Sequence, residues 1–162
     1  MTFKLSERSM SKLRGVHPDL VKVVTTAIKL TDVDFGCICG LRTTEEQEEL
    51  VAKGASKTMK SFHLRQADGF SHAVDLMAYV GSRASWEEEL YDNIADAMKK
   101  AAAQHGVDIT WGGAWQTDPD VRWLNMRDWQ GTMEQASLAY IDLRRKQGRR
   151  PFYDGPHFEL TR

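Results

Sequence analysis

The chain has 162 residues, of which 22 are lysine or arginine and 23 are aspartate or glutamate, so its formal net charge is -1. Hydrophobic residues make up 41% of it and charged residues 28%, as in an ordinary globular protein of one domain. The balanced charge lacks the basic excess of a nucleic-acid-binding protein, and no apolar run approaches the ~20 residues of a membrane span. We therefore expect no nucleic-acid partner, no stable insertion into a membrane and, because the first residues are polar, no signal peptide.

The first half of the chain is expected to hold three helices and a strand. A capping serine and the apolar spacing predict a short helix over 6–13, and Pro18 suits the first turn of a second helix over 18–30. The segment 34–40, DFGCICG, predicts a strand. A threonine cap predicts a third helix over 43–54, which ends at a glycine.

The second half is expected to alternate strands and helices. Strands are predicted over 72–80, 107–111 and 157–160, and helices over 86–106 and 131–146. Because these strands are few and can pair locally, the sequence favours an α+β fold in a single domain, with a small antiparallel sheet flanked by helices.

Both cysteines, Cys37 and Cys39, fall in the predicted strand over 34–40. Residues at i and i+2 of a strand point to the same side, so we expect two free, buried thiols. The C-x-C spacing is a poor start for a zinc site, which usually has C-x2-C.

Polar residues at strand ends and in loops could form a site that performs chemistry. Two histidines and a carboxylate are the ligands of a catalytic zinc that keeps one open position. A second carboxylate could activate the bound water, and an arginine could stabilise a developing oxyanion. The candidates are Arg42, Ser61, His63, Asp75, Asp154 and His157.

Each candidate also has an ordinary structural explanation. A histidine in a loop is usually solvated, and Asp154 precedes a glycine in a common turn pair. Asp75 is the exception, because it interrupts an apolar strand, where a carboxylate needs a cation, a metal or several donors.

Taken together, four ordered motifs resemble a known family. SFHLRQADGFSHAVDL resembles the S-x-H-x-x-G-x-A-x-D motif of zinc peptidases that include D-alanyl-D-alanine carboxypeptidases and dipeptidases. DGPHFEL resembles that family's acidic-x-x-His motif, GLRTTEEQEEL its G-x-R-[ST]-x-x-E-Q segment and WGGAW its Trp-Gly-Gly turn. SERS, HAVDL and DGPHFEL are most similar to the branch of phage endolysins that are L-alanyl-D-glutamate peptidases. The resemblance spans about residues 5 to 160.

The resemblance implies a role for each matched residue. The implied Zn2+ ligands are His63, Asp75 and His157. Asp154 would be the general base, and Arg42 would stabilise the oxyanion. Apart from the resemblance, Glu159 is the next candidate for the base, because it lies two residues past His157 on the same strand face, although that face suits it better to support the metal site. The implied substrate-binding residues are Ser61, Gln47 and His72.

The spacing departs from the family at one point. The family has seven residues from its histidine to its aspartate, whereas His63 and Asp75 are twelve apart. The longer loop makes His72 a rival ligand. We prefer His63, because residues three apart on a regular strand face opposite ways, and His72 would then line the site.

The resemblance also implies how the chain is organised. Residues 1–162 would form a single zinc peptidase catalytic domain, with an insertion at about 116–150. The basic run Arg144–Arg150 in this insertion could touch the anionic cell wall, or it could be a solvated helix end, where cations are favourable.

The function implied is a phage-type endolysin that hydrolyses the L-Ala-D-Glu bond of peptidoglycan stem peptides during host lysis. The alternatives are a D-alanyl-D-alanine carboxypeptidase or dipeptidase and a non-catalytic cell-wall-binding relative. A general base retained beside three ligands argues against the latter. The chain would be a monomer, made in the host cytoplasm and acting on peptidoglycan in the periplasm. A separate membrane-permeabilising protein would let it reach the wall.

Overall fold

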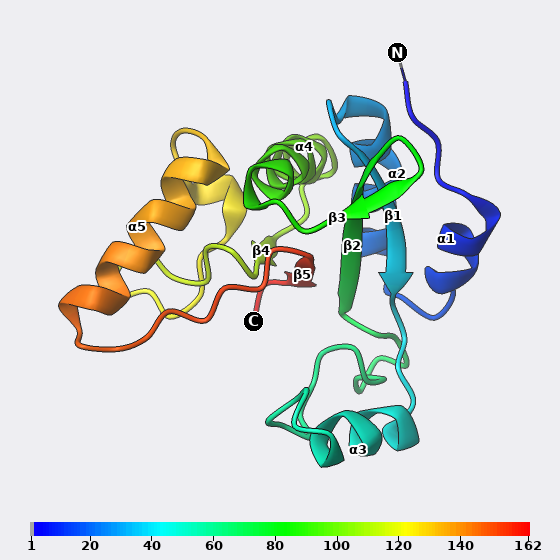
Figure 1. Ribbon diagram of the computed structural model, residues 1–162, viewed down its shortest axis with the longest axis horizontal. Helices are drawn as coiled ribbons and strands as arrows, with labels where there is room; N and C mark the ends of the chain where they lie inside the picture. The colour runs from blue at the N-terminus through cyan, green and yellow to red at the C-terminus, as the bar shows by residue number, and fades with distance from the viewer. Residues whose placement is uncertain (1) are drawn as a thin grey trace.

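The computed structural model describes residues 2–162, and within them it has five α-helices, one short 3-10 helix and one five-stranded antiparallel sheet (Figure 1). This arrangement confirms the predicted α+β fold. The helices are α1 (Glu7–Lys12), α2 (Pro18–Leu30), α3 (Thr44–Ala52), α4 (Glu88–His105) and α5 (Met133–Lys146), and the 3-10 helix is η1 (Met126–Asp128). None of the described helices combines the length and the apolar composition that a membrane crossing requires.

The sheet is centred on one long strand, β2. The hydrogen-bonded order of the strands in the sheet is β1-β2-β5-β4. The short β3, which the sequence did not predict, also pairs with β2. The strands are β1 (Asp34–Cys39), β2 (Ala73–Val80), β3 (Arg83–Ser85), β4 (Ile109–Trp111) and β5 (His157–Leu160). In register, Asp75 of β2 lies opposite Cys39 on one side and His157 on the other. The sheet thereby brings together three polar residues that are far apart in the sequence.

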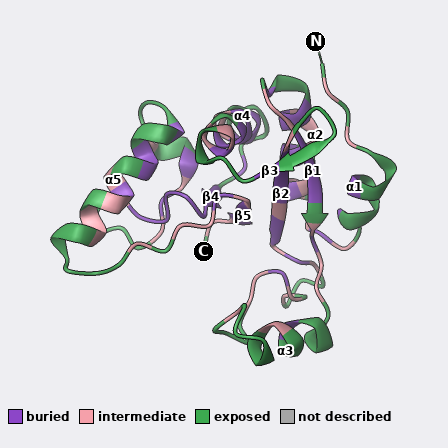
Figure 2. Cartoon of the chain, in the orientation of Figure 1, coloured by how far each residue is buried: buried purple, intermediate pink, exposed green. Residues whose placement is uncertain are grey.

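The core lies between the sheet and the two long helices α2 and α4. Alternation along β2 buries Val74, Leu76 and Ala78 in a cluster that includes Val24 and Ile94 of these helices. Figure 2 shows the buried strands and the inner faces of α2 and α4, whereas α3 and its following loop are mostly exposed. Because Asp75 is out of phase with these three residues of β2, it points to the other face of the sheet.

A β-bulge changes the expected placement of the cysteines. The register shifts between Cys37 and Cys39, so that Cys37 pairs with Leu76 and Cys39 pairs with Asp75. Both thiols are free, and Cys37 is buried in the core as expected. The expectation of burial is wrong for Cys39, which is half-buried because the bulge brings it to the polar edge beside Asp75.

The segment 116–150 packs on the outer side of α4. The backbone N–H of Met133 donates to Asp96 (2.8 Å), and the ammonium of Lys99 donates to the carbonyl of Gly131 (3.1 Å). At the far end of α5, Arg144 donates to Gln116 at 2.9 Å, while the rest of the basic run is exposed. The exposure of the basic run agrees with the alternative in which it is the solvated end of α5.

Candidate metal centre

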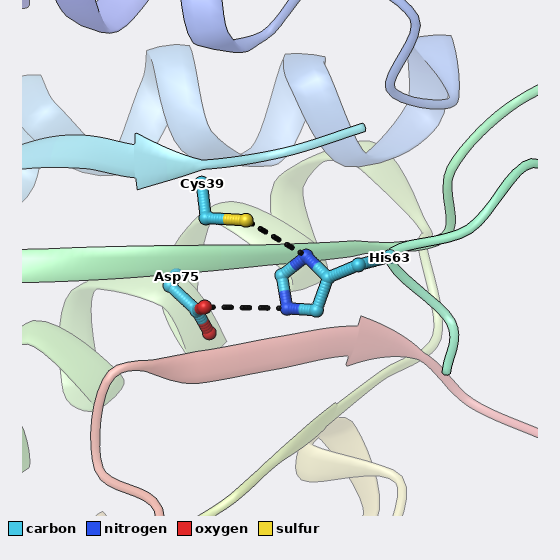
Figure 3. A group of neighbouring side chains, drawn as sticks. All are labelled: Cys39, His63 and Asp75. Atoms are coloured by element: carbon cyan, nitrogen blue, oxygen red, sulfur yellow. Dashed lines mark hydrogen bonds and ion pairs between the residues drawn. The ribbon is translucent and has the colours of Figure 1, made fainter. Parts of the chain in front are cut away.

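A carboxylate between two imidazoles forms the centre of the site. Asp75 Oδ2 lies 3.3 Å from His63 Nε2, and Asp75 Oδ1 lies 3.4 Å from His157 Nδ1. The two rings are 5.2 Å apart between centroids. Figure 3 shows His63, in the loop before β2, pointing at Asp75 and at Cys39. Residues from β1, the loop, β2 and β5 therefore converge at one point.

The loop that carries His63 fixes which ring nitrogen faces Asp75. His63 Nδ1 lies 2.9 Å from the carbonyl oxygen of Gly40, and because a carbonyl can only accept, Nδ1 carries the hydrogen. Nε2 is then the ring nitrogen that faces Asp75. Ser61 Oγ accepts the backbone N–H of His63 (3.1 Å), and Arg42 donates its backbone N–H to the carbonyl of His63 (2.8 Å).

A second set of contacts fixes the ring of His157. Its Nε2 lies 2.8 Å from Oε1 of Glu159, which is only 1% exposed and accepts a further bond from Arg162 Nε (2.8 Å). The guanidinium of Arg162 lies over the rings of Phe62 (4.2 Å) and Trp123 (4.6 Å). Glu159 therefore holds the hydrogen on Nε2 and leaves Nδ1 of His157 free to face the central carboxylate.

The Trp-Gly-Gly turn after β4 holds Asp154 beside this centre. Trp111 Nε1 donates to the carbonyl of Gly155 (2.7 Å), and the backbone of Asp154 donates to the carbonyl of Gly112 (2.9 Å). Gly112 in turn donates to the carbonyl of His157 (2.8 Å). As a result, ligand atoms of Asp75, Asp154 and His157 all lie within 4.8 Å of one another.

Gly112 offers a test of this turn. A Cβ built on Gly112 would lie 2.2 Å from the carbonyl oxygen of Asp154, so Gly112→Ala must displace the loop. We expect a cost of ~1–3 kcal/mol in unfolding free energy, as for overpacked sites, and a loss of activity because Asp154 moves. Thermal unfolding and hydrolysis assays measure the two effects.

The control is Gly148→Ala. Unlike Gly112, Gly148 has a positive φ of 68°, and nothing lies within 4 Å of its Cβ position. This variant is expected to lose a little stability and keep its activity. Equal activity in the two variants would contradict a role for the turn in placing Asp154.

Arg42 lies against the same carboxylate, held by a buried glutamine. Arg42 Nη2 is 3.8 Å from Asp75 Oδ2 and 3.4 Å from Cys39 Sγ, and Nη1 donates to Gln47 Oε1 (2.8 Å). Gln47 is fully buried and donates its amide to the carbonyl of Thr58 (2.6 Å). Gln47, which was expected to bind substrate, thus has an enclosed amide that positions the guanidinium of Arg42.

His72 does not join the central group. Its Nε2 contacts Asp68 Oδ2 at 2.7 Å, and its ring packs edge-on against His17 and Phe62. Ser61, also expected to bind substrate, is half-buried and uses its hydroxyl to hold the backbone of His63. The structure thus brings together Arg42, His63, Asp75, Asp154 and His157, and leaves His72 with Asp68.

Two neighbours of the centre were not predicted from the sequence. Cys39 Sγ lies 3.6 Å from His63 Nδ1, close enough for Cys39, His63 and Asp75 to form a second potential metal-binding group. Trp115 covers the ring of His157, with 5.4 Å between ring centroids. The WGGAW motif contains Trp115, but nothing in the motif indicates which residue its indole covers.

The electrostatics of the centre follow from its geometry. Burial opposes the charge on Asp75, but contacts with His157 and His63 outweigh it and hold the pKa of Asp75 far below its usual value. Burial also disfavours the charged forms of the two histidines, yet the contacts with Asp75 outweigh it and raise the pKa of His63 to about 10 and that of His157 to about 9. Burial raises the pKa of Asp154. A divalent cation could replace the two imidazolium protons, so the group could hold a metal ion.

Comparison with known proteins identifies similar chains. The family model described as phage L-alanyl-D-glutamate peptidase matches residues 1–128. The L-alanyl-D-glutamate peptidase of Escherichia phage T5 is 27% identical over 124 residues, covering 74% of this chain and 87% of the relative. The crystal structure of the Serratia marcescens L-Ala D-Glu endopeptidase ChiX has a TM-score of 0.68 and 33% identity, covering 98% of this chain and 90% of that one.

Proposed function

The chain belongs to the phage L-alanyl-D-glutamate peptidase family, and from that premise we propose that it is a zinc endopeptidase that hydrolyses the L-Ala-D-Glu bond of peptidoglycan stem peptides. One observation carries the proposal. Asp75 is flanked by two histidines whose outer nitrogens are both occupied, so that Nε2 of His63 faces Oδ2 and Nδ1 of His157 faces Oδ1 of the same carboxylate.

The donor set fits zinc. Two ligands at ~2.05 Å from a tetrahedral zinc lie about 3.3 Å apart. Oδ2 of Asp75 lies 3.3 Å from His63 Nε2 and Oδ1 lies 3.4 Å from His157 Nδ1, so each imidazole is at this spacing from one oxygen of the carboxylate, and both distances exceed the ~2.8 Å of a charge-assisted hydrogen bond. We propose His63, Asp75 and His157 as the three protein ligands, which leaves a fourth position open, as in catalytic zinc sites.

Zinc bound there supplies a water nucleophile at neutral pH and polarises the scissile carbonyl. We propose that Asp154 takes a proton from the attacking water and later delivers it to the leaving amine. Burial raises the pKa of this carboxyl, which favours its holding the proton between the two steps.

Arg42 is proposed to stabilise the oxyanion that develops on the substrate carbonyl. Its guanidinium is largely buried, with 15% of the side chain exposed, so its charge is less screened than it would be in solvent. Gln47 and Cys39 fix two of its nitrogens, which limits the movement needed during reaction.

Glu159 is proposed to position His157 rather than to act as the base, because His157 and Arg162 occupy its carboxylate. Glu159→Gln should weaken zinc binding by ~10–100-fold, since a neutral amide makes the ligand imidazole less basic. Competition with a chelator measures the zinc affinity. The exposed Glu45→Gln, in the first turn of α3, is the control and should bind zinc normally. Unchanged affinity in Glu159→Gln would contradict the positioning role.

Digestion of purified peptidoglycan tests the function itself. Mass spectrometry should find new N-terminal D-Glu on intact disaccharide strands. Released D-Ala would instead indicate a D-alanyl-D-alanine carboxypeptidase or dipeptidase, and the absence of products would indicate a non-catalytic wall-binding relative. Metal analysis of the same preparation should find about one zinc per chain.

The cellular setting proposed is that of an endolysin. The chain would act as a monomer on periplasmic peptidoglycan, after a separate protein has permeabilised the membrane. We also propose that residues 1–162 form one catalytic domain into which 116–150 is inserted. The family match ends at residue 128, before α5 begins.

A further inference from the structure

A pocket of about 280 Å³ opens beside the metal centre, between the start of α4 and the loop before β5. Its lining includes Trp86, Tyr91, Tyr153, Pro156 and the carboxylates Glu88 and Asp154. We call it the Trp86 pocket. Because Asp154 belongs to both the pocket and the group around Asp75, whatever occupies the pocket lies next to the proposed scissile bond.

Trp86 forms an exposed aromatic surface on a rigid base. It is 66% exposed, yet its ring stacks on Tyr91 with 6.5 Å between centroids and 17° between planes. Tyr91 is 1% exposed and its hydroxyl donates to the carbonyl of Ser85 (2.7 Å). An indole that is held flat while most of it faces solvent is a ready surface for stacking, because little side-chain entropy remains to be lost on binding.

The charges around the pocket limit what it can accept. Glu88 and Asp154 line the pocket. Asp92 follows Glu88 by four residues on α4, and its pKa is raised to about 6, first by burial and then by the charges of Glu134, Asp96 and Glu88. These surroundings are negative. The D-Glu side of a stem peptide carries free carboxylates and would be repelled. On the other side of the scissile bond, L-Ala is linked through a lactyl group to N-acetylmuramic acid, and that end has no free charge.

We propose that the Trp86 pocket is a saccharide subsite in which Trp86 stacks on the pyranose ring of the N-acetylmuramoyl residue that bears the stem peptide. The inference rests on the proposed cleavage after L-Ala. The lactyl and alanyl units together span about 7 Å, at ~3.3–3.6 Å per residue. Asp154 and Trp86 line the same pocket, so one substrate with its scissile bond at Asp154 can place the pyranose ring on Trp86.

Two matched substrates test the subsite: an N-acetylmuramoyl stem peptide, and the same peptide with an acetyl group in place of the muramoyl group. We expect Trp86→Ala to lower kcat/KM about tenfold for the muramoyl peptide and less than twofold for the acetyl peptide. Leu138→Ala is the control, because Leu138 is 60% exposed on α5 and lines no part of the pocket. It should change neither rate.

The outcomes separate the two proposals. If the wild-type protein cleaves neither substrate, the proposed function fails, and the subsite with it. If it cleaves both and Trp86→Ala leaves the ratio of the two rates unchanged, the subsite alone is overturned. Trp86→Phe guards against a folding defect, since a smaller aromatic ring should retain part of the preference for the muramoyl peptide.

Discussion

Asp154→Asn is expected to keep its fold and its bound zinc while losing hydrolysis by at least ~10²–10⁴-fold, the usual contribution of a general acid–base group. The loop should persist, because the bonds that join it to Gly112 and His157 involve only the backbone. Asparagine has nearly the same shape as aspartate but cannot accept the proton of the attacking water. Zinc content and turnover of peptidoglycan, measured on one preparation, give both readouts.

Asp118→Asn is the matched control for that variant. Asp118 also closes a turn, with Oδ1 accepting the backbone N–H of Asp120 at 2.9 Å, and it lies outside the metal centre. Full activity in Asp154→Asn would reduce Asp154 to a turn residue. Loss of zinc from Asp154→Asn would make Asp154 a ligand instead of a base.

Local patterns were enough to predict most of the elements. Thr43 caps α3 and exchanges bonds with Glu46 as the capping box requires, and Gly106 ends α4 in the left-handed conformation. Alternation along 72–80 also placed Asp75 on the face opposite Val74, Leu76 and Ala78. These features depend on spacing and on backbone preferences, which a sequence displays directly.

Features that depend on tertiary contacts could not be predicted in this way. The bulge that turns Cys39 toward His63 has no signature in DFGCICG, which reads as a regular strand. Gln47 is fully buried only because Arg42, Ser56 and Thr58 satisfy its amide, and hydropathy indicates an exposed residue instead.

The order of residues along β5 shows where sequence reasoning succeeds and where it stops. The two-residue period places His157 and Glu159 on one face, which indicates that they can interact. It does not reveal that Arg162, between Phe62 and Trp123, contacts the same carboxylate. The tautomer of His157, and hence the nitrogen offered to a metal, depends on that three-dimensional arrangement.

The ligand assignment predicts opposite effects for two neighbouring histidines. His63→Ala should reduce bound zinc from about one per chain to nearly none, because two protein ligands hold the ion too weakly. His72→Ala should keep its zinc, since His72 contacts Asp68 and lies outside the potential metal-binding groups. Metal analysis after dialysis against a weak chelator gives the comparison, and thermal unfolding confirms that both variants fold. A zinc-free His72→Ala beside a zinc-loaded His63→Ala would transfer the role to His72 and would require the loop over 64–71 to rearrange when zinc binds.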